Sequence, residues 1–109
     1  MKVLFLPEVR QYLKELQNTL FEKEYFGFED AAVQYVRDLI FDIEETLPIR
    51  ASKEAPAYFN SYGKGMRYAS FRKNRDTQWY VFFNKYKENG ELIYLVRYIS
   101  NNHVIAQYL

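Results

Sequence analysis

The sequence contains no cysteine, and this absence excludes several kinds of chemistry. A chain without thiols has no disulfide bond, no cysteine nucleophile and no thiolate ligand for a metal ion. His103 is the only histidine, and one histidine without cysteine cannot build a standard zinc site. We therefore expect no metal site, and the lack of disulfides suits a reducing cytoplasm.

Glycine, proline and long apolar runs are also scarce. The four glycines form neither the Gly-x4-Gly-Lys-Ser/Thr loop that binds phosphates nor the Gly-x-Ser-x-Gly elbow of hydrolases. The N-terminal apolar run, Val3 to Leu6, is too short for a signal peptide or a membrane span. These absences predict a cytoplasmic protein that carries no cofactor and does not associate with a membrane.

Aromatic residues, by contrast, are abundant: the 109 residues include 11 tyrosines, nine phenylalanines and one tryptophan. The hydrophobic share of 49% and the charged share of 27% are typical of a soluble globular protein. The length is enough for one domain, residues 1–109, with a modest core. A surplus of tyrosine suits either a half-exposed sheet face or a binding surface, because the ring packs while the hydroxyl forms hydrogen bonds.

Charge is distributed unevenly along the chain although the net charge is only +1. Residues 1–54 carry seven Lys/Arg against eleven Asp/Glu, whereas residues 55–109 carry eight Lys/Arg against three Asp/Glu. Such an asymmetry indicates where an anionic partner would bind. The C-terminal half is therefore the expected location of a site for nucleic acid or an acidic protein.

Two amphipathic helices are predicted in the N-terminal half. The first begins at Pro7, which suits a first helical turn, and the second begins at Glu29 and ends before Pro48. Their apolar residues recur at the spacing of one helical face: Val9, Tyr12, Leu13, Leu16 and Leu20, then Ala32, Val36, Leu39, Ile40, Ile43 and Leu47. A break around Tyr25-Phe26-Gly27 separates the two, so an antiparallel helical hairpin is expected.

Strand-like patterns occur at the N-terminus and in the C-terminal half. Lys2 to Leu6 predicts a strand at an edge or second position of a sheet. Three more strands are predicted as a meander: Met66–Arg72, Gln78–Tyr86 and Leu92–Ser100. Lys87 to Glu91 connects the last two, because Asn89-Gly90 readily adopts the positive φ angles of a tight turn.

The predicted fold class is α+β. An N-terminal strand and a two-helix hairpin pack on an antiparallel sheet of three to four strands. The connector over residues 50–64 is expected to contain a short extended piece at Ala57–Phe59, and Asn101–Leu109 is expected to be a short tail. The aromatic strand alternates between one face with Trp79, Val81 and Phe83 and another with Tyr80, Phe82 and Asn84. The sequence leaves open which of these faces meets the helices.

The best candidates for contacting an anionic partner form a basic stretch followed by aromatic residues. Guanidinium groups match phosphate oxygens bidentately, and the rings of Trp79 and Tyr80 offer stacking surfaces for bases. The predicted nucleic-acid-binding residues are Lys64, Arg67, Arg72, Lys73, Arg75, Asn101 and Asn102. The alternative is that the turn over residues 73–76 is merely a solvated loop, and the sequence leaves this open.

Two further residues carry potential chemistry near the end of the chain. Arg97 interrupts an otherwise apolar strand, so its charge must reach solvent, a partner or a pocket. His103 directly follows Asn101-Asn102, and histidine is the side chain that exchanges protons near neutral pH. A lone histidine is more often incidental than catalytic, so both interpretations of His103 remain open.

The order of elements, the arginine-rich and aromatic strands and the final segment Val96 to His103 resemble the RelE/ParE toxin superfamily of type II toxin–antitoxin pairs. The resemblance covers nearly the whole chain in architecture, and its sequence signature is concentrated between Met66 and Tyr108. It implies a toxin whose partner is a cognate antitoxin protein. RelE-like members cleave mRNA in the ribosomal A site, whereas ParE-like members inhibit DNA gyrase and lack the nuclease residues.

Resemblance to the RelE branch implies a metal-independent mRNA endoribonuclease that acts with the ribosome and inhibits translation. A ribose 2′-hydroxyl would attack the adjacent phosphate, which requires proton transfer and cations for the phosphate charge. The resemblance implies His103 as an acid or base, Arg97 (with Arg67 or Arg72) as a phosphate-holding residue, and Tyr108 as the functional tyrosine near the terminus.

The sequence also departs from the nuclease pattern. Tyr68 and Ser70 stand where RelE-like nucleases tend to show lysine, and Tyr80 and Asn102 stand where they show arginine. These departures favour two alternatives to the endoribonuclease. One is a ParE-like toxin that inhibits DNA gyrase without cleaving anything, and the other is a non-toxic nucleic-acid-binding or interaction module of the same fold.

Overall fold

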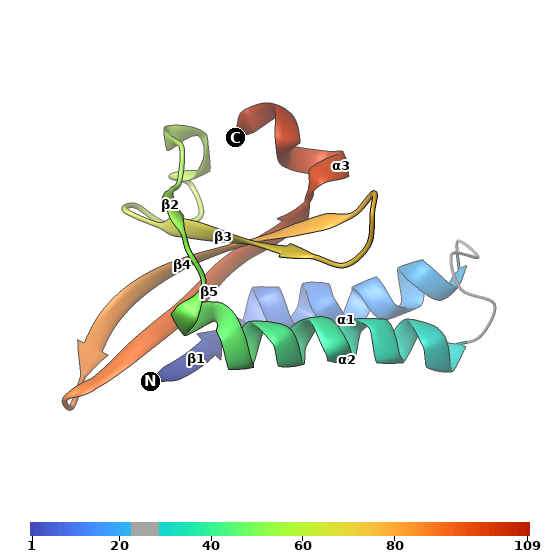
Figure 1. Cartoon of the computed structure of the whole chain (residues 1–109), viewed down its shortest axis with the longest axis horizontal. Helices are drawn as coiled ribbons and strands as arrows, with labels where there is room; N and C mark the ends of the chain where they lie inside the picture. The colour runs from blue at the N-terminus through green and yellow to red at the C-terminus, as the bar shows by residue number, and fades with distance from the viewer. Residues whose placement is uncertain (23–28) are drawn as a thin grey trace.

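The structure, a computed structural model, describes residues 1–22 and 29–109, and within them the chain forms a five-stranded sheet with two long helices on one face (Figure 1). The strands are β1 (Lys2–Phe5), β2 (Lys53–Glu54), β3 (Arg67–Arg72), β4 (Gln78–Glu88) and β5 (Glu91–Asn101). The helices are α1 (Pro7–Glu22), α2 (Glu29–Thr46) and α3 (Asn102–Ile105), with the 3-10 turns η1 (Leu47–Ile49), η2 (Ala57–Phe59) and η3 (Ala106–Tyr108). The predicted α+β class is confirmed.

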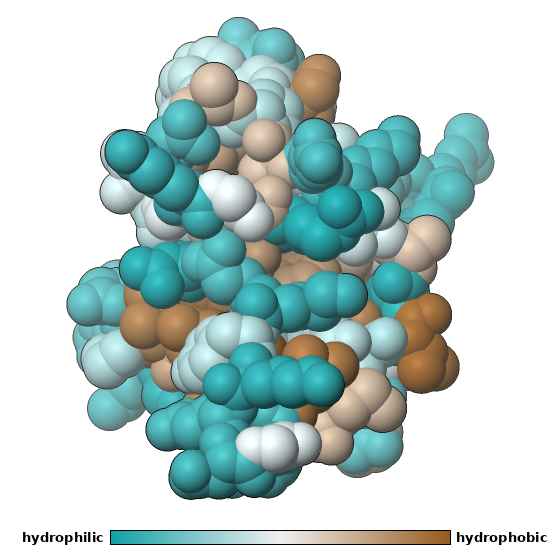
Figure 2. Space-filling view, turned by 90° about the vertical axis from the view of Figure 1, so that its left-hand side faces the viewer, coloured by the Kyte–Doolittle hydropathy of each residue, from teal (hydrophilic) through white to brown (hydrophobic). Residues whose placement is uncertain are grey.

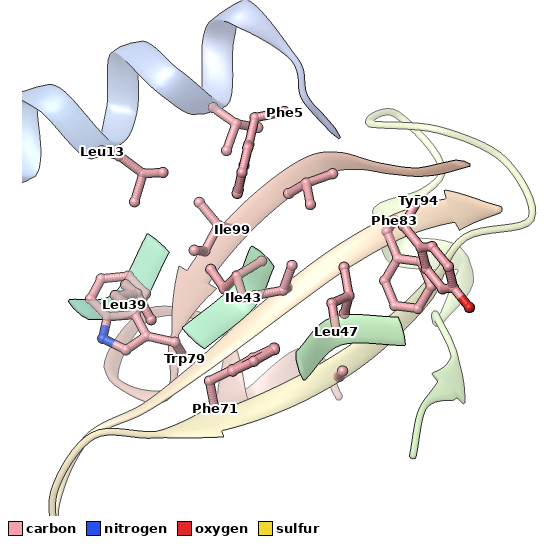
Figure 3. Packing of buried hydrophobic residues seen from close by; sticks show 14 of the residues in the cluster. Phe5, Leu13, Leu39, Ile43, Leu47, Phe71, Trp79, Phe83, Tyr94 and Ile99 are labelled. Atoms are coloured by element: carbon pink, nitrogen blue, oxygen red, sulfur yellow. The ribbon is translucent and has the colours of Figure 1, made fainter. Parts of the chain in front are cut away.

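The two predicted helices are confirmed, and their apolar stripes face the sheet. Val9 and Leu13 of α1 and Val36 and Leu39 of α2 are buried there, in the positions that the spacing predicted. Figure 3 shows these helices packed over Trp79 and other side chains of the sheet. The predicted break at residues 25–27 lies outside the described part of the chain. Among the described helices, none has the length and apolar character needed to cross a membrane.

The predicted antiparallel sheet of three to four strands is wrong in strand number and polarity. The strand order is β1-β5-β4-β3-β2, and β1 runs parallel to β5 with Lys2 beside Ile93 and Phe5 beside Val96. Turn signals predict the polarity only of strands that are neighbours in sequence, whereas β1 pairs with β5, the last strand along the chain. The two-residue strand β2 is too short to show an alternating pattern.

The aromatic strand β4 packs on both faces of the sheet. Trp79, Val81 and Phe83 join the core under the helices, which answers the question that the sequence left open. On the opposite face, Phe82 is buried with Phe59 of η2 and with Met66 and Ile105. We call this opposite face the aromatic face, defined by Tyr68, Tyr80, Phe82 and Tyr98.

Two connections differ from the sequence prediction. Ala57–Phe59 is the 3-10 turn η2 rather than an extended piece, because Phe59 N–H donates to Pro56 C=O and Asn60 N–H to Ala57 C=O. The β4–β5 hairpin turns on Asn89 and Gly90 alone, with φ angles of 51° and 79°. The strands therefore reach Glu88 and Glu91, and the connection is tighter than the five residues expected.

The packing of α2 on the sheet predicts a contrast between two residues of this helix. Leu39 is 0% exposed and Phe41 is 64% exposed. Leu39→Ala should lower the free energy of unfolding by about 2–5 kcal/mol because it leaves a cavity. Phe41→Ala should change it by less than about 0.5 kcal/mol. Urea unfolding measures both, and equal effects would contradict this placement of the helix.

Candidate functional site beside the β3–β4 turn

Two adjacent asparagines fix the start of α3 at the end of β5. The side-chain oxygen of Asn101 accepts a hydrogen bond from His103 N–H at 2.9 Å, which caps the helix. Asn102 Oδ1 accepts from Gln78 N–H at 2.9 Å, and its Nδ2 donates to Asp76 C=O at 3.1 Å. Asn102 thereby fastens α3 to the β3–β4 turn, residues 73–77, using both ends of its amide.

The β3–β4 turn is itself braced by side chains. Asn74 Oδ1 accepts hydrogen bonds from the N–H groups of Asp76 and Thr77, both at 2.9 Å. The guanidinium of Arg72 donates to the carbonyls of Asn74 and Arg75, both at 3.2 Å. A turn held by an asparagine and an arginine keeps its exposed groups in fixed positions. The side chains of Arg72 and Arg75 are both exposed.

His103 lies against this turn with its imidazole in contact with solvent. Its Nε2 is 3.4 Å from Thr77 Oγ1, a distance at which the ring either donates or accepts according to its tautomer. The main chain of His103 is fixed by the Asn101 cap, and its ring is fixed on one side by Thr77. An exposed histidine is thus held against the β3–β4 turn, which carries Arg75 and directly follows Arg72, and these residues form the candidate site.

The aromatic face of the sheet continues from the candidate site. Ser70 of β3 pairs with Tyr80 of β4, which pairs with Ser100 of β5, directly before the Asn101 cap. Tyr68 stacks on Phe82 at 5.3 Å between ring centroids and contacts Tyr80 edge-on at 6.0 Å. The partly buried rings of Tyr68 and Tyr80, supported by the buried Phe82, offer the candidate site a surface on which a planar group can stack.

Arg97 lies at a β-bulge, which explains how a charge fits in an apolar strand. Phe82 pairs with Tyr98 and Phe83 with Val96, so Arg97 is the extra residue of β5. Its Nε donates to Tyr62 C=O at 3.0 Å. Gly63 permits this approach, since a Cβ there would lie 2.6 Å from Arg97 Nε.

The same arginine lines a groove of about 550 Å³ between α1, the loop after η2 and β5. The groove reaches Val104, the residue after His103, and it is also lined by Tyr12 and Tyr98. Burial raises the pKa of Tyr12 and of Tyr98 above the usual tyrosine value. Arg97 therefore belongs to a hollow beside the candidate site, without a direct contact to His103.

Tyr108 packs against η2, away from His103. Its ring stacks on Tyr58 with the centroids 3.9 Å apart and the planes at 4°. The hydrogen bond with Tyr108 is the main cause that raises the pKa of Tyr58 above its usual value. The three residues predicted as catalytic therefore have different neighbours. His103 contacts Thr77, Arg97 contacts Tyr62, and Tyr108 contacts Tyr58.

The basic stretch does not form one patch. Arg67 donates to Ser52 Oγ and to Ser52 C=O, both at 2.7 Å, at the opposite end of β3 from Arg72. The ammonium of Lys73 lies over the ring of Tyr35 on α2 at 5.0 Å. Lys64 is exposed, and its carbonyl accepts from Asn84 Nδ2. Arg72 and Arg75 are joined to each other in the hydrogen-bonded β3–β4 turn region against which His103 lies.

Sequence reasoning missed two residues of this region. Thr77 is the side chain in contact with His103, and Lys53 lies on the aromatic face beside Tyr68 through the β2–β3 pairing. A threonine next to a basic turn gives no distinctive signal. Lys53 belongs to a strand of two residues, for which alternation cannot be recognised in the sequence.

Compared with family models, with curated proteins and with solved structures, the chain matches none of them. The resemblance to the RelE/ParE superfamily therefore rests on the element order and the residues named above. What it implies for activity and partners enters below as a proposal.

The Asn101 cap generates a stability prediction. Asn101→Ala removes the acceptor of the His103 N–H and should cost about 0.5–2 kcal/mol of unfolding free energy. Asn101→Asp keeps a capping oxygen and should stay close to the unsubstituted protein. Urea unfolding, together with the exchange rate of the His103 amide proton, measures the effect. An alanine variant as stable as the aspartate variant would show that the cap does not hold α3.

The Tyr58–Tyr108 stack generates a prediction about pH. Because the pKa of Tyr58 is raised above 10.0 in the folded chain, folding favours its neutral form. The stabilisation is complete below about pH 10 and is lost as pH rises through the folded pKa. Tyr108→Phe removes the hydroxyl that raises this pKa, so the ring signals of Tyr58 in NMR spectra should titrate at lower pH. An unchanged titration would contradict the docking of η3 on η2.

Proposed function

We propose that this protein is a RelE/ParE-like toxin that binds RNA on the aromatic face and cleaves it beside His103. The observation that carries the proposal is the position of His103, which is exposed, anchored by Asn101 and held next to Thr77 of a turn that carries Arg75 and directly follows Arg72. A proton-transfer group beside fixed cations is what cleavage of a phosphodiester requires. The charge asymmetry of the chain points to the same half of the molecule.

In the proposed reaction the ribose 2′-oxygen attacks the adjacent phosphorus and the bond from phosphorus to the 5′-oxygen breaks. The products are a 2′,3′-cyclic phosphate and a 5′-hydroxyl end. One proton leaves the 2′-hydroxyl and one reaches the 5′-oxygen, and His103 transfers one of these two protons. Arg72 and Arg75 offer guanidinium donors to the phosphate oxygens as negative charge develops. Thr77 orients the imidazole.

A ParE-like inhibitor of DNA gyrase is the second candidate, and a particular observation favours it. Asn102, which occupies an arginine position of the nuclease pattern, has both ends of its amide engaged within the protein. Tyr68, Ser70 and Tyr80 fill the other positions with uncharged side chains. A surface with fewer cations than the nuclease pattern would bind its target without cleaving RNA. A protein of the same fold that binds a partner but is not toxic is the third candidate.

The proposal includes a cognate antitoxin, and the groove beside Arg97 is a suitable place for part of it. Beyond the β1 pairing, which ends at Val96, residues 97–100 of β5 line this groove opposite α1. Arg97 lines the groove and offers a positive charge to an acidic chain. A partly apolar, acidic tail that folds on binding would cover the tyrosines there.

The endoribonuclease hypothesis predicts a large effect of one exposed residue. His103→Ala should reduce mRNA cleavage in a ribosome-containing translation mixture by about 10²- to 10⁴-fold, because a proton-transfer group is lost. The urea midpoint should hardly move, since the imidazole is exposed. Lys87→Ala, on the distant β4–β5 hairpin, is the matched surface control and should cleave normally.

Mapping of mRNA ends and growth after induced expression decide between the candidates. Cleavage and growth inhibition that are unaffected by His103→Ala would contradict the role of His103. Growth inhibition with intact mRNA and with impaired supercoiling by purified gyrase would establish the second candidate instead. If induced expression neither inhibits growth nor cleaves mRNA, the non-toxic interaction module is the remaining candidate.

A further inference from the structure

A second hollow lies on the sheet beside the aromatic face, at the border of β2 and β3. Its volume is about 440 Å³, and it is lined by Arg50, Ala51, Ser52, Lys53, Tyr68 and Ser70. Tyr68 and Ser70 are the positions at which the sequence departs from the lysines of the nuclease pattern. The hollow therefore lies where the resemblance implies phosphate contacts, yet the strand itself supplies no cation there.

The cation of the hollow comes instead from the neighbouring strand. Lys53 pairs directly with Tyr68 in the antiparallel β2–β3 ladder, so the two side chains project from the same face. Lys53 is exposed, and Tyr68 is half-buried with its ring held by Phe82 and Tyr80. The result is an exposed ammonium beside a fixed aromatic ring.

The opposite wall of the hollow is rigid. Arg50 donates to Ser70 C=O at 3.1 Å and to Thr46 Oγ1 at 2.9 Å, and its guanidinium lies 4.0 Å from the ring centre of Phe71. Asp42 accepts from Arg50 at 3.1 Å and balances its charge. Arg50 therefore shapes the wall, while Lys53 is the cation available to a ligand.

We propose that this hollow is a nucleotide subsite for single-stranded RNA, in which a base stacks on Tyr68 and its phosphate binds Lys53. The inference rests on the proposed function. It identifies a place where the protein would bind a part of the RNA that lies at a distance from the bond that is cleaved. Tyr68, Ser70 and Arg72 alternate on one face of β3. An RNA strand that follows β3 from the hollow would therefore reach Arg72 at the start of the β3–β4 turn, against which His103 lies.

The surface around β2 favours a polar ligand over an apolar protein segment. In Figure 2, which views the molecule from the left-hand side of Figure 1, hydrophilic side chains predominate and hydrophobic ones lie in separate patches. Stacking of a base on a tyrosine with a cation nearby is a common mode of single-strand binding and tolerates any base sequence. The hollow thus provides affinity, whereas cleavage would take place beside His103.

Binding of a fluorescent single-stranded uridine oligomer to the His103→Ala protein tests the proposal without cleavage. Tyr68→Ala should weaken binding by about 5- to 100-fold, and Tyr68→Phe, which keeps the stacking surface, should restore it. Lys53→Ala should weaken binding and reduce the dependence of log affinity on log salt by about 0.7. Lys53→Arg should retain both. Tyr86→Ala and Lys87→Ala, at the far end of β4, are the matched controls.

The outcomes separate this inference from the proposed function. If Lys53→Ala and Lys87→Ala weakened RNA binding equally, the effect would reflect only the overall charge of the protein, and the subsite would be overturned. The subsite would stand, and the nuclease proposal would fail, if Lys53 and Tyr68 control RNA binding but the unsubstituted protein cleaves no mRNA. His103-dependent cleavage together with binding unaffected by Lys53→Ala would overturn the subsite alone. The subsite would also be overturned if Lys53→Ala abolished the binding of a protein partner while leaving the binding of RNA unchanged.

Discussion

The side chains of β4 are buried on both faces of the sheet, with Trp79 under the helices and Phe82 under η2. An isolated two-layer fold would leave Phe82 in water, so the chain must cover the second face as well. It does so with two short pieces, η2 from the connector and α3 from the C-terminus. The positions of both pieces, and with them the candidate site, follow from the need to bury this second aromatic row.

Covering the second face with short pieces imposes a further requirement. A helix of four residues has little stability of its own, so α3 depends on side-chain hydrogen bonds and on the burial of Ile105. Asn101 supplies a bond within the helix, and Asn102 supplies two more, to Gln78 of β4 and to Asp76 of the β3–β4 turn. The residues that hold the fold together here are the same ones that fix His103, which couples the site to the stability of the C-terminus.

The sequence was sufficient for the elements whose signals are local. The stripes of both helices, the alternation of β4 and the Asn89-Gly90 turn each depend on neighbouring residues, and all are found. The parallel β1–β5 pair and the two-residue strand β2 depend on distant contacts and were not predicted. The same division holds for the candidate site. The sequence singled out Asn101-Asn102-His103 as a segment, whereas the contact with Thr77 and the separation from Arg97 and Tyr108 depend on how the strands pair.

That separation constrains how the proposed reaction could proceed. Two proton transfers are needed, and the structure offers one imidazole at the site, with Arg97 held by Tyr62 and Tyr108 held by Tyr58. A site with one proton-transfer group must obtain more of its rate from orienting the substrate. The aromatic face is suited to this, because its rings are fixed by mutual packing and by the sheet. In the proposed toxin, the tyrosines that replace the usual cations would then contribute through position rather than through charge.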